Sequence, residues 1–287
     1  MSQLLAERYG EDAGKAVPEL TFLSFSKENF YLRTKVTGFA IRQKRVPISL
    51  FMNVDYNLGG IVDKKLIRVA ENTLLARCKE LWVFGGISDG MLVEIFLAKK
   101  KGLPIRYFSL PDEGHDIAEI SENEVTLANV SKWVWEWVLS GKNLERWHPR
   151  LRIRKTYPLV YPAYSKKNFY LQTYISKYCL ENLTIPINPF MIFRYFLSDT
   201  VPREDIYLGN RAIIDNIDEL WTFGPLSDGV LAEVSLAKKR GHKVKHYKIV
   251  QDKPSVRFRK VPAQFVELEE PELEKYRGIL LDEIHNK

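Results

Sequence analysis

The 287-residue chain is poor in cysteine and has no long hydrophobic run. Its two cysteines, Cys78 and Cys179, form neither a metal-ligand pair nor a disulfide framework, which fits a reducing compartment. The longest apolar stretches are far shorter than the ~20 residues that a membrane-spanning helix needs. The first residues lack the basic start and apolar core of a secretory signal. We therefore expect a cytoplasmic protein that does not interact with a membrane.

The common motifs for metal and phosphate chemistry are also missing. The five histidines have no metal-ligand spacing, and the chain has no Walker loop, zinc pattern or Gly-x-Ser-x-Gly elbow. We interpret His242 and His246 as surface positions on or before a strand. The sequence predicts neither a metal nor an organic cofactor.

The net charge of +7 is spread over short basic runs such as "AKKKG", "AKKRG" and "HPRLRIRK". A basic surface attracts anionic ligands, including nucleotides and nucleic acids. No helix-turn-helix or RNA-binding motif accompanies these runs. The simpler interpretation is a solvated face or a linker, with a nucleic-acid groove as the alternative.

The chain contains an internal duplication. A shift of 139 residues aligns 22–110 with 161–249 without a gap, so that "ELWVFGGISDG" matches "ELWTFGPLSDG". The period is too long for a solenoid, and each copy is therefore a domain-sized unit. We place the first domain at residues 1–150 and the second at 151–287, with the boundary in "HPRLRIRK".

Strands and helices alternate within each copy. In the first copy we expect strands at 20–25, 46–52, 80–84 and 103–109, with helices at 26–43, 65–78 and 89–101 between them. This alternation favours parallel pairing with right-handed crossovers. The predicted fold is α/β: two tandem Rossmann-like or flavodoxin-like three-layer sandwiches with parallel sheets, related by the duplication.

An appendage of similar length follows the core of each copy. The first contains a Trp-rich helix at 129–143, and the second an acidic helix at 270–284. Trp133 and Trp137 share a helix face, whereas Trp135 points roughly the other way. We expect the Trp133–Trp137 face to pack against a core, with an interface as the alternative.

One glutamate in each copy does not suit its surroundings. Glu94 in "MLVEIFLA" and Glu233 in "VLAEVSLA" have small or apolar neighbours three and four positions away, so neither lies on a polar stripe. Burying a carboxylate without partners is costly or forces it to take up a proton. The pattern predicts a polar cleft against each helix. The alternative is a structural Glu that accepts hydrogen bonds from the amides of a neighbouring loop.

A Ser-Asp-Gly turn precedes both helices, where a strand ends. The serine of each turn is expected to be the helix N-cap, and the aspartate a first-turn acid that favours the helix dipole, with ligand contact as the alternative. Amides at a helix N-terminus bind phosphate, and ligands of open parallel sheets bind at this edge. The candidate substrate-binding residues are Ser88, Asp89, Gly90, Ser227, Asp228 and Gly229.

These residues resemble the nucleoside 2-deoxyribosyltransferase-like superfamily, which includes the deoxyribonucleoside 5′-monophosphate N-glycosidases. Its members carry a strand, a Ser-x-Gly loop and a Glu six residues after the Ser. The resemblance covers the core of each repeat. It implies that Ser88 and Ser227 hold a phosphate or sugar, and that Glu94 and Glu233 attack C1′ of the sugar and displace the base.

The superfamily often places a second acid in the helix before the motif strand. The nearest positions here are Glu71 and Asn210, which align with each other, so the resemblance implies that only the first copy keeps this acid. The first-strand loops, "SFSKEN" and "AYSKKN", lack the glycine and arginine that are common in the superfamily. Lys27 and Lys166 lie in these loops, where we interpret them as surface residues or, alternatively, as contacts to an anionic ligand.

We therefore expect an N-glycosidase or deoxyribosyltransferase that acts on a nucleoside, nucleotide or related metabolite through a Glu nucleophile. The alternative is a non-catalytic nucleotide-binding or sensing protein that uses the same cleft. Superfamily members usually pair, so we expect the two repeats to pack as an intrachain pseudo-dimer, with a homo-oligomer as a further option.

Overall fold

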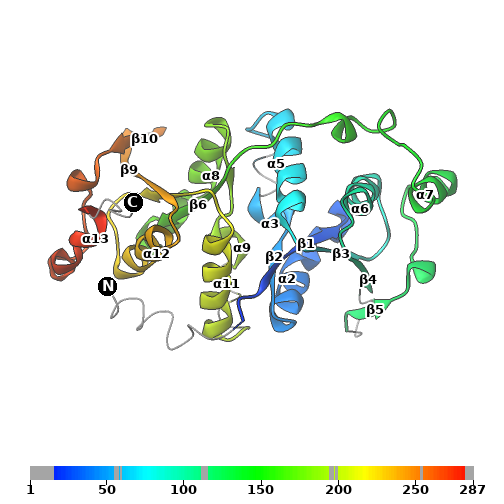
Figure 1. The fold of residues 1–287 in the computed structure, drawn as a ribbon, viewed down its shortest axis with the longest axis horizontal. Coiled ribbons are helices and arrows are strands. Elements are labelled where there is room, and N and C mark those ends of the chain that lie inside the picture. The colour runs from blue at the N-terminus through cyan, green and yellow to red at the C-terminus, as the bar shows by residue number, and fades with distance from the viewer. Residues whose placement is uncertain are drawn as a thin grey trace.

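The structure is a computed structural model that describes residues 16–54, 58, 60–110, 116–193, 197, 200–252 and 255–281. The two repeats form two α/β units side by side, each built on a five-stranded sheet (Figure 1). The first sheet has the order β2-β1-β3-β4-β5, and the second has the same order for its equivalent strands, β7-β6-β8-β9-β10. This is the strand order of flavodoxin-like sheets, and it confirms the predicted tandem α/β fold.

The strands of each sheet are parallel except at one edge. In the first sheet they are β1 (Glu19–Phe25), β2 (Arg45–Ile48), β3 (Glu80–Phe84), β4 (Ile105–Ser109) and the antiparallel β5 (Ala118–Ile120). In the second they are β6 (Leu159–Tyr164), β7 (Ile185–Pro186), β8 (Glu219–Phe223), β9 (Lys243–Asp252) and the antiparallel β10 (Ser255–Val261). The expectation of wholly parallel sheets is therefore wrong at this edge, because the start of each appendage turns back and pairs with the sheet.

Helices cover both faces of each sheet. The first unit has α2 (Arg33–Arg42) after the 3-10 turn η2 (Lys27–Leu32), then α3 (Leu50–Asn53), α5 (Lys64–Arg77), α6 (Asp89–Lys101) and α7 (Lys132–Leu139), with η3 (Glu122–Glu124) and η4 (Pro149–Arg152) around α7. The second has η5 (Lys166–Leu171), α8 (Gln172–Glu181), α9 (Pro189–Ile192), α11 (Arg203–Asp215), α12 (Asp228–Lys239), η6 (Ala263–Phe265), η7 (Pro271–Tyr276) and α13 (Gly278–Leu281).

Strand β3 shows why the sheet is buried on both faces. Leu81 and Val83 pack in the large core that includes α5 and α6, whereas Trp82 and Phe84 pack with residues of α2 on the opposite face. Alternate side chains of a strand point to opposite faces, so an unbroken apolar run needs a helix layer on each side.

Two predicted elements differ from the observed ones. The strand expected at 46–52 ends at Ile48, and the apolar run continues in α3, which buries Met52. The acidic helix expected at 270–284 is a 3-10 turn followed by the short α13, and residues 282–284 lie outside the described residues.

The Trp-rich helix buries the face opposite to the expected one. Val134, Trp135 and Val138 are its buried residues, while Trp133 is 51% and Trp137 is 40% exposed. The two exposed rings contact each other edge to face, with centroids 5.2 Å apart. The expected packing of this pair against a core is therefore wrong.

The two repeats contact each other through equivalent elements. Helix α3 contacts its counterpart α9, and α5 contacts β7 just as α11 contacts β2. The large core includes buried residues from both repeats. Ion pairs also join the repeats, among them Lys44–Asp205 at 2.6 Å and Arg77–Asp218 at 2.7 Å. No described helix is long and apolar enough to span a membrane.

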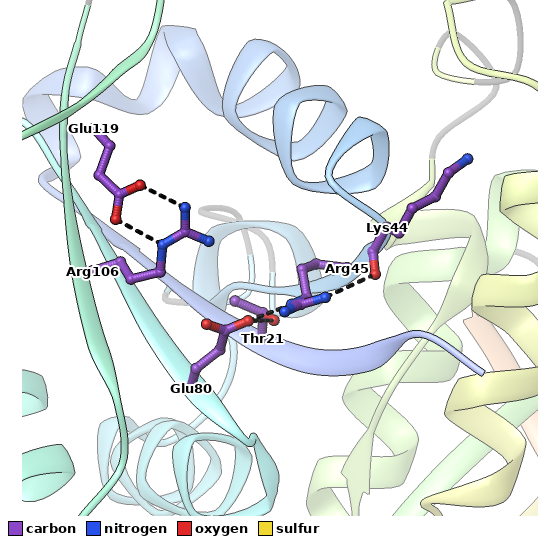
Figure 2. Close-up of polar contacts among 6 residues, drawn as sticks. All are labelled: Thr21, Lys44, Arg45, Glu80, Arg106 and Glu119. Carbon is purple, nitrogen blue, oxygen red and sulfur yellow. Dashed lines mark hydrogen bonds and ion pairs between the residues drawn. The ribbon is translucent and has the colours of Figure 1, made fainter. Parts of the chain in front are cut away.

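A polar network closes the amino-terminal edge of the first sheet (Figure 2). Glu80 accepts hydrogen bonds from Arg45 and, at 3.2 Å, from Thr21, and Arg106 pairs with Glu119 through two hydrogen bonds of 2.8 and 2.6 Å. Burial raises the pKa of Glu80, but the hydrogen bonds from Arg45 and Thr21 and the positive charge of Arg45 outweigh burial and lower it. The network therefore fixes the amino-terminal ends of the strands, opposite to the carboxyl ends at which the Ser-Asp-Gly turn lies.

Gly85 provides a test of the turn after β3. Its φ is +71°, and an added Cβ would lie 2.8 Å from Leu110 Cδ1, so Gly85→Ala is expected to lower the free energy of unfolding by about 1–3 kcal/mol. Gly90→Ala is the control, because a Cβ there meets nothing within 4 Å. We expect it to leave stability unchanged or raise it by up to about 1 kcal/mol. Equal urea-denaturation midpoints for the two variants would contradict this account of the turn.

Candidate functional site

A cavity of about 400 Å³ opens in the first unit, where β1 and β3 end and α6 begins. The strand order reverses between these two strands, and open α/β sheets bind ligands at this point. The candidate residues of the first repeat that line the cavity are Glu71, Ser88, Asp89, Gly90 and Glu94. The structure therefore brings together all of the candidates from this repeat.

Glu94 lies on α6 and is 8% exposed. Its Oε2 accepts a hydrogen bond from Ser24 Oγ at 2.5 Å, and its Oε1 lies 3.1 Å from Arg150 Nη1. A buried charge needs partners of this kind. The carboxylate is thus held by two side chains on the cavity wall, and not by loop amides among the described residues.

Arg150 is the functional residue that the sequence interpretation missed. It is 4% exposed, and its Nε lies 2.9 Å from Glu71 Oε2. The amide of Asn72 fixes it from both sides: Nε donates to Asn72 Oδ1 at 3.1 Å, and Asn72 Nδ2 donates to the carbonyl of Arg150 at 3.0 Å. Its Nη2 is buried and has no hydrogen-bond partner among the described residues. One guanidinium therefore joins the two candidate carboxyl groups.

The solvated-linker interpretation of "HPRLRIRK" is wrong for Arg150. Arg152 and Arg154 are exposed, as expected. The local sequence gives no signal that separates Arg150 from them, because its partners Glu94 and Asn72 lie 56 and 78 residues away along the chain. The domain boundary itself stays a prediction.

Glu71, on α5, has an unusual protonation equilibrium. It is 9% exposed, and burial is the main cause that raises its pKa to about 7. The positive charges of Arg150 and Arg68 oppose this shift, whereas the negative charge of Glu94 adds to it. Glu71 is consequently a carboxyl group that is largely protonated below neutral pH, beside the carboxyl group of Glu94.

The amino-terminal end of α6 is accessible from the cavity. Ser88 occupies the N-cap position, as predicted, but its side chain makes no capping hydrogen bond. Asp89 and Gly90 are exposed, and the space beside the Gly90 Cα is open. The Ser88 hydroxyl and the first amides of the helix are therefore positioned to contact a ligand.

The second repeat keeps the buried glutamate but not the residues that surround it in the first repeat. Glu233 is buried and accepts a hydrogen bond from the Tyr161 hydroxyl at 2.8 Å. Ala163 replaces Ser24, and the buried Asn210 replaces Glu71. The Oδ1 atom of Asn210 has no hydrogen-bond partner among the described residues.

The start of α12 also differs from that of α6. Ser227 is the N-cap and accepts from the amide of Val230 at 3.5 Å, and Asp228 accepts from the amide of Gly229 at 2.6 Å. The side chains of this turn therefore already occupy amides that remain available in the first repeat.

The histidines do not form a metal site in the described part of the chain, where no group of three or more His, Cys, Asp or Glu residues could hold a metal ion. The surface assignment of His246 is wrong: it is buried, lies 2.8 Å from the Thr222 hydroxyl, and has a pKa lowered to about 4 by burial. His148 Nδ1 accepts from the amide of Arg150 at 3.2 Å. His115 and His285 lie outside the described residues.

A comparison with protein-family models matches two segments of the chain, 26–108 and 160–247, to "Domain of unknown function (DUF7768)". Together these segments make up more than half of the chain. The chain belongs to the DUF7768 family. The two matched segments coincide with the two repeats, so this protein carries a tandem DUF7768 arrangement. No curated protein and no solved structure matches the chain significantly.

Replacing Arg150 tests the charge network of the first DUF7768 segment. Arg150→Ala leaves two buried carboxyl groups without their cation, and we expect a loss of about 3–5 kcal/mol in the free energy of unfolding. The loss should be largest above pH 7, where Glu71 is ionised, and smaller at pH 5.5, where Glu71 carries a proton. Urea denaturation at both pH values measures it.

The exposed Arg152 supplies the matched control, because Arg152→Ala should change stability by less than about 0.5 kcal/mol. Equal effects of the two substitutions, or a loss at Arg150 that does not depend on pH, would refute the proposed network.

Proposed function

We propose that the first repeat cleaves the N-glycosidic bond of a nucleoside, nucleotide or related metabolite, as an N-glycosidase or deoxyribosyltransferase. The observation that carries this proposal is the pair of buried carboxyl groups, Glu94 and Glu71, that share Arg150 on the wall of the cavity. This chemistry needs two neighbouring carboxyl groups, one to attack and one to donate a proton, and the raised pKa of Glu71 suits the second of these roles.

In the proposed reaction an oxygen of Glu94 attacks C1′ of the sugar, and the bond between C1′ and the base nitrogen breaks. Glu71 gives its proton to the departing base. The carboxylate of Glu71 then takes a proton from a water molecule, whose oxygen attacks C1′ and releases Glu94. An acceptor base in place of this water would give a transferase. A pKa of about 7 suits Glu71 for both proton transfers near neutral pH.

Other lining residues support a nucleoside-like ligand. The rings of Phe25 and Phe51 lie with centroids 5.1 Å apart, and both residues line the cavity. Aromatic faces of this kind stack on bases. The hydroxyls of Ser24 and Ser88 lie on the same cavity wall as Glu94 and suit a sugar. The resemblance of the Ser-x-Gly and Glu pattern to the nucleoside 2-deoxyribosyltransferase-like superfamily supports the same assignment.

The second repeat lacks the second carboxyl group that turnover needs, and the second candidate function is therefore the binding of a nucleotide without turnover. Asn210 cannot donate a proton as a carboxylic acid does, and Glu233 is bound to a tyrosine hydroxyl. We propose that the two repeats act as an intrachain pseudo-dimer with one catalytic site. The contact of α3, which carries Phe51, with α9 supports this arrangement, since the second repeat then braces one wall of the first site.

Release of free base from a panel of nucleosides, nucleotides and NAD, followed by chromatography, tests the proposal. We expect release by the wild-type protein, a fall of about 10²–10⁴-fold in Glu71→Gln, and a greater fall in Glu94→Gln. Both substitutions keep the side-chain shape, and Glu136→Gln on the exposed face of α7 is the control for a surface change.

Glu233→Gln reports on the second repeat, and retained release in this variant is the expected result. No release from any compound by the wild-type protein would eliminate the enzyme and leave the binding function. Release that persists in a Glu94→Ala/Glu233→Ala double variant would show that neither glutamate is the nucleophile.

A further inference from the structure

The ionisable side chains that line the cavity of the first repeat include more acids than bases. Four are acidic and two are basic: Glu28, Glu71, Asp89, Glu94, Lys27 and Arg150. The charge of Arg150 lies between Glu71 and Glu94, and Lys27 directly precedes Glu28 in the chain. The cavity therefore offers no excess positive charge to a ligand.

Two of the acids that line the cavity are exposed, so a phosphate that came from solvent would meet them. Asp89 is the first residue of α6, and Glu28 lies in the first turn of η2. Both are exposed, and neither forms a hydrogen bond or ion pair with another described residue, although Asp89 acts electrostatically on His148. The amino-terminal end of a helix attracts anions through its dipole, but a carboxylate in the first turn opposes this attraction. A phosphate would also approach Glu94 in the same cavity.

The second repeat carries a different charge at the equivalent mouth position. Lys167 aligns with Glu28, so the pair Lys27–Glu28 of the first repeat corresponds to Lys166 and Lys167 in the second. The fold therefore accepts a lysine at this position, and the acid at 28 is a feature of the first repeat alone.

The neutral part of the cavity suits an uncharged ligand. The buried Ser26 makes no capping hydrogen bond, and its side chain lines the cavity together with those of Ser24 and Ser88. These hydroxyls can bond to the hydroxyls of a sugar, and the Phe25–Phe51 pair can contact a base.

We propose that Glu28 and Asp89 are specificity-determining residues that exclude a phosphate, so that the first repeat takes uncharged nucleosides in preference to nucleoside 5′-monophosphates. The inference rests on the proposed function, which supplies the class of ligand. It goes beyond that function by stating that the sugar, and not a phosphate, contacts Ser88. The preference is electrostatic, and it therefore shrinks as ionic strength rises.

Calorimetric titration of the full chain tests this preference. The four common 2′-deoxynucleosides and their 5′-monophosphates are titrated into the Glu71→Gln variant. This substitution mimics the protonated acid, is expected to slow turnover and leaves Glu94 in place. We expect the best nucleoside to bind at least tenfold more tightly than its monophosphate. Glu28→Lys combined with Asp89→Asn in the same background should reduce this ratio at least fivefold. Glu136→Lys makes the same charge change as Glu28→Lys on α7 and should leave the ratio unaltered.

Three results would overturn the inference: monophosphates that bind as tightly as nucleosides, a ratio that the double substitution does not change, or no binding by any nucleoside. Failure of the proposed function gives a different result. Nucleosides would then bind with the expected preference over monophosphates, but the wild-type protein would release no base.

Discussion

The first site depends on the two ion pairs that the Arg150 guanidinium forms with Glu71 and Glu94. Two buried carboxyl groups on neighbouring helices repel each other and lose hydration, and a shared cation offsets both effects. The need for this cation also constrains residues outside the pair of carboxyl groups, because Arg150 belongs to η4 and is fixed by Asn72 of α5. The segment that joins the two repeats is therefore also a wall of the first site.

This dependence gives a physical account of how the repeats diverged. The second repeat has Asn210 in place of Glu71, and its Glu233 accepts a hydrogen bond from Tyr161. The amides at the start of α12 are bonded to the side chains of Ser227 and Asp228, whereas the equivalent serine in the first repeat makes no capping bond. The same fold thus carries a pair of carboxyl groups in the first repeat, and a glutamate and an asparagine at the same two positions in the second.

Sequence patterns predicted the features that depend on local order. The duplication, the alternation of strands and helices and the extent of α6 followed from periodicity and capping residues. Glu94, a polar residue in an apolar helix, predicted a cleft against α6, and a cavity lies there. Features set by distant contacts were not predictable. Arg150 and Arg152 look alike in the sequence, and only the packing of η4 on α5 and α6 separates them. The burial of His246 and the exposure of Trp133 and Trp137 were predicted wrongly for the same reason. Whether each side chain is covered depends on residues that lie elsewhere in the chain.

The protonation of Glu71 decides whether the first repeat can donate a proton as proposed. Carboxyl ¹³C NMR of protein labelled at glutamate can follow this protonation as pH is varied. One resonance should titrate near pH 7, and it should be absent from the spectrum of Glu71→Gln. A Glu71 resonance that titrates near 4.5, the ordinary value for a glutamate, would contradict the account, because the residue would then carry no proton to give at neutral pH.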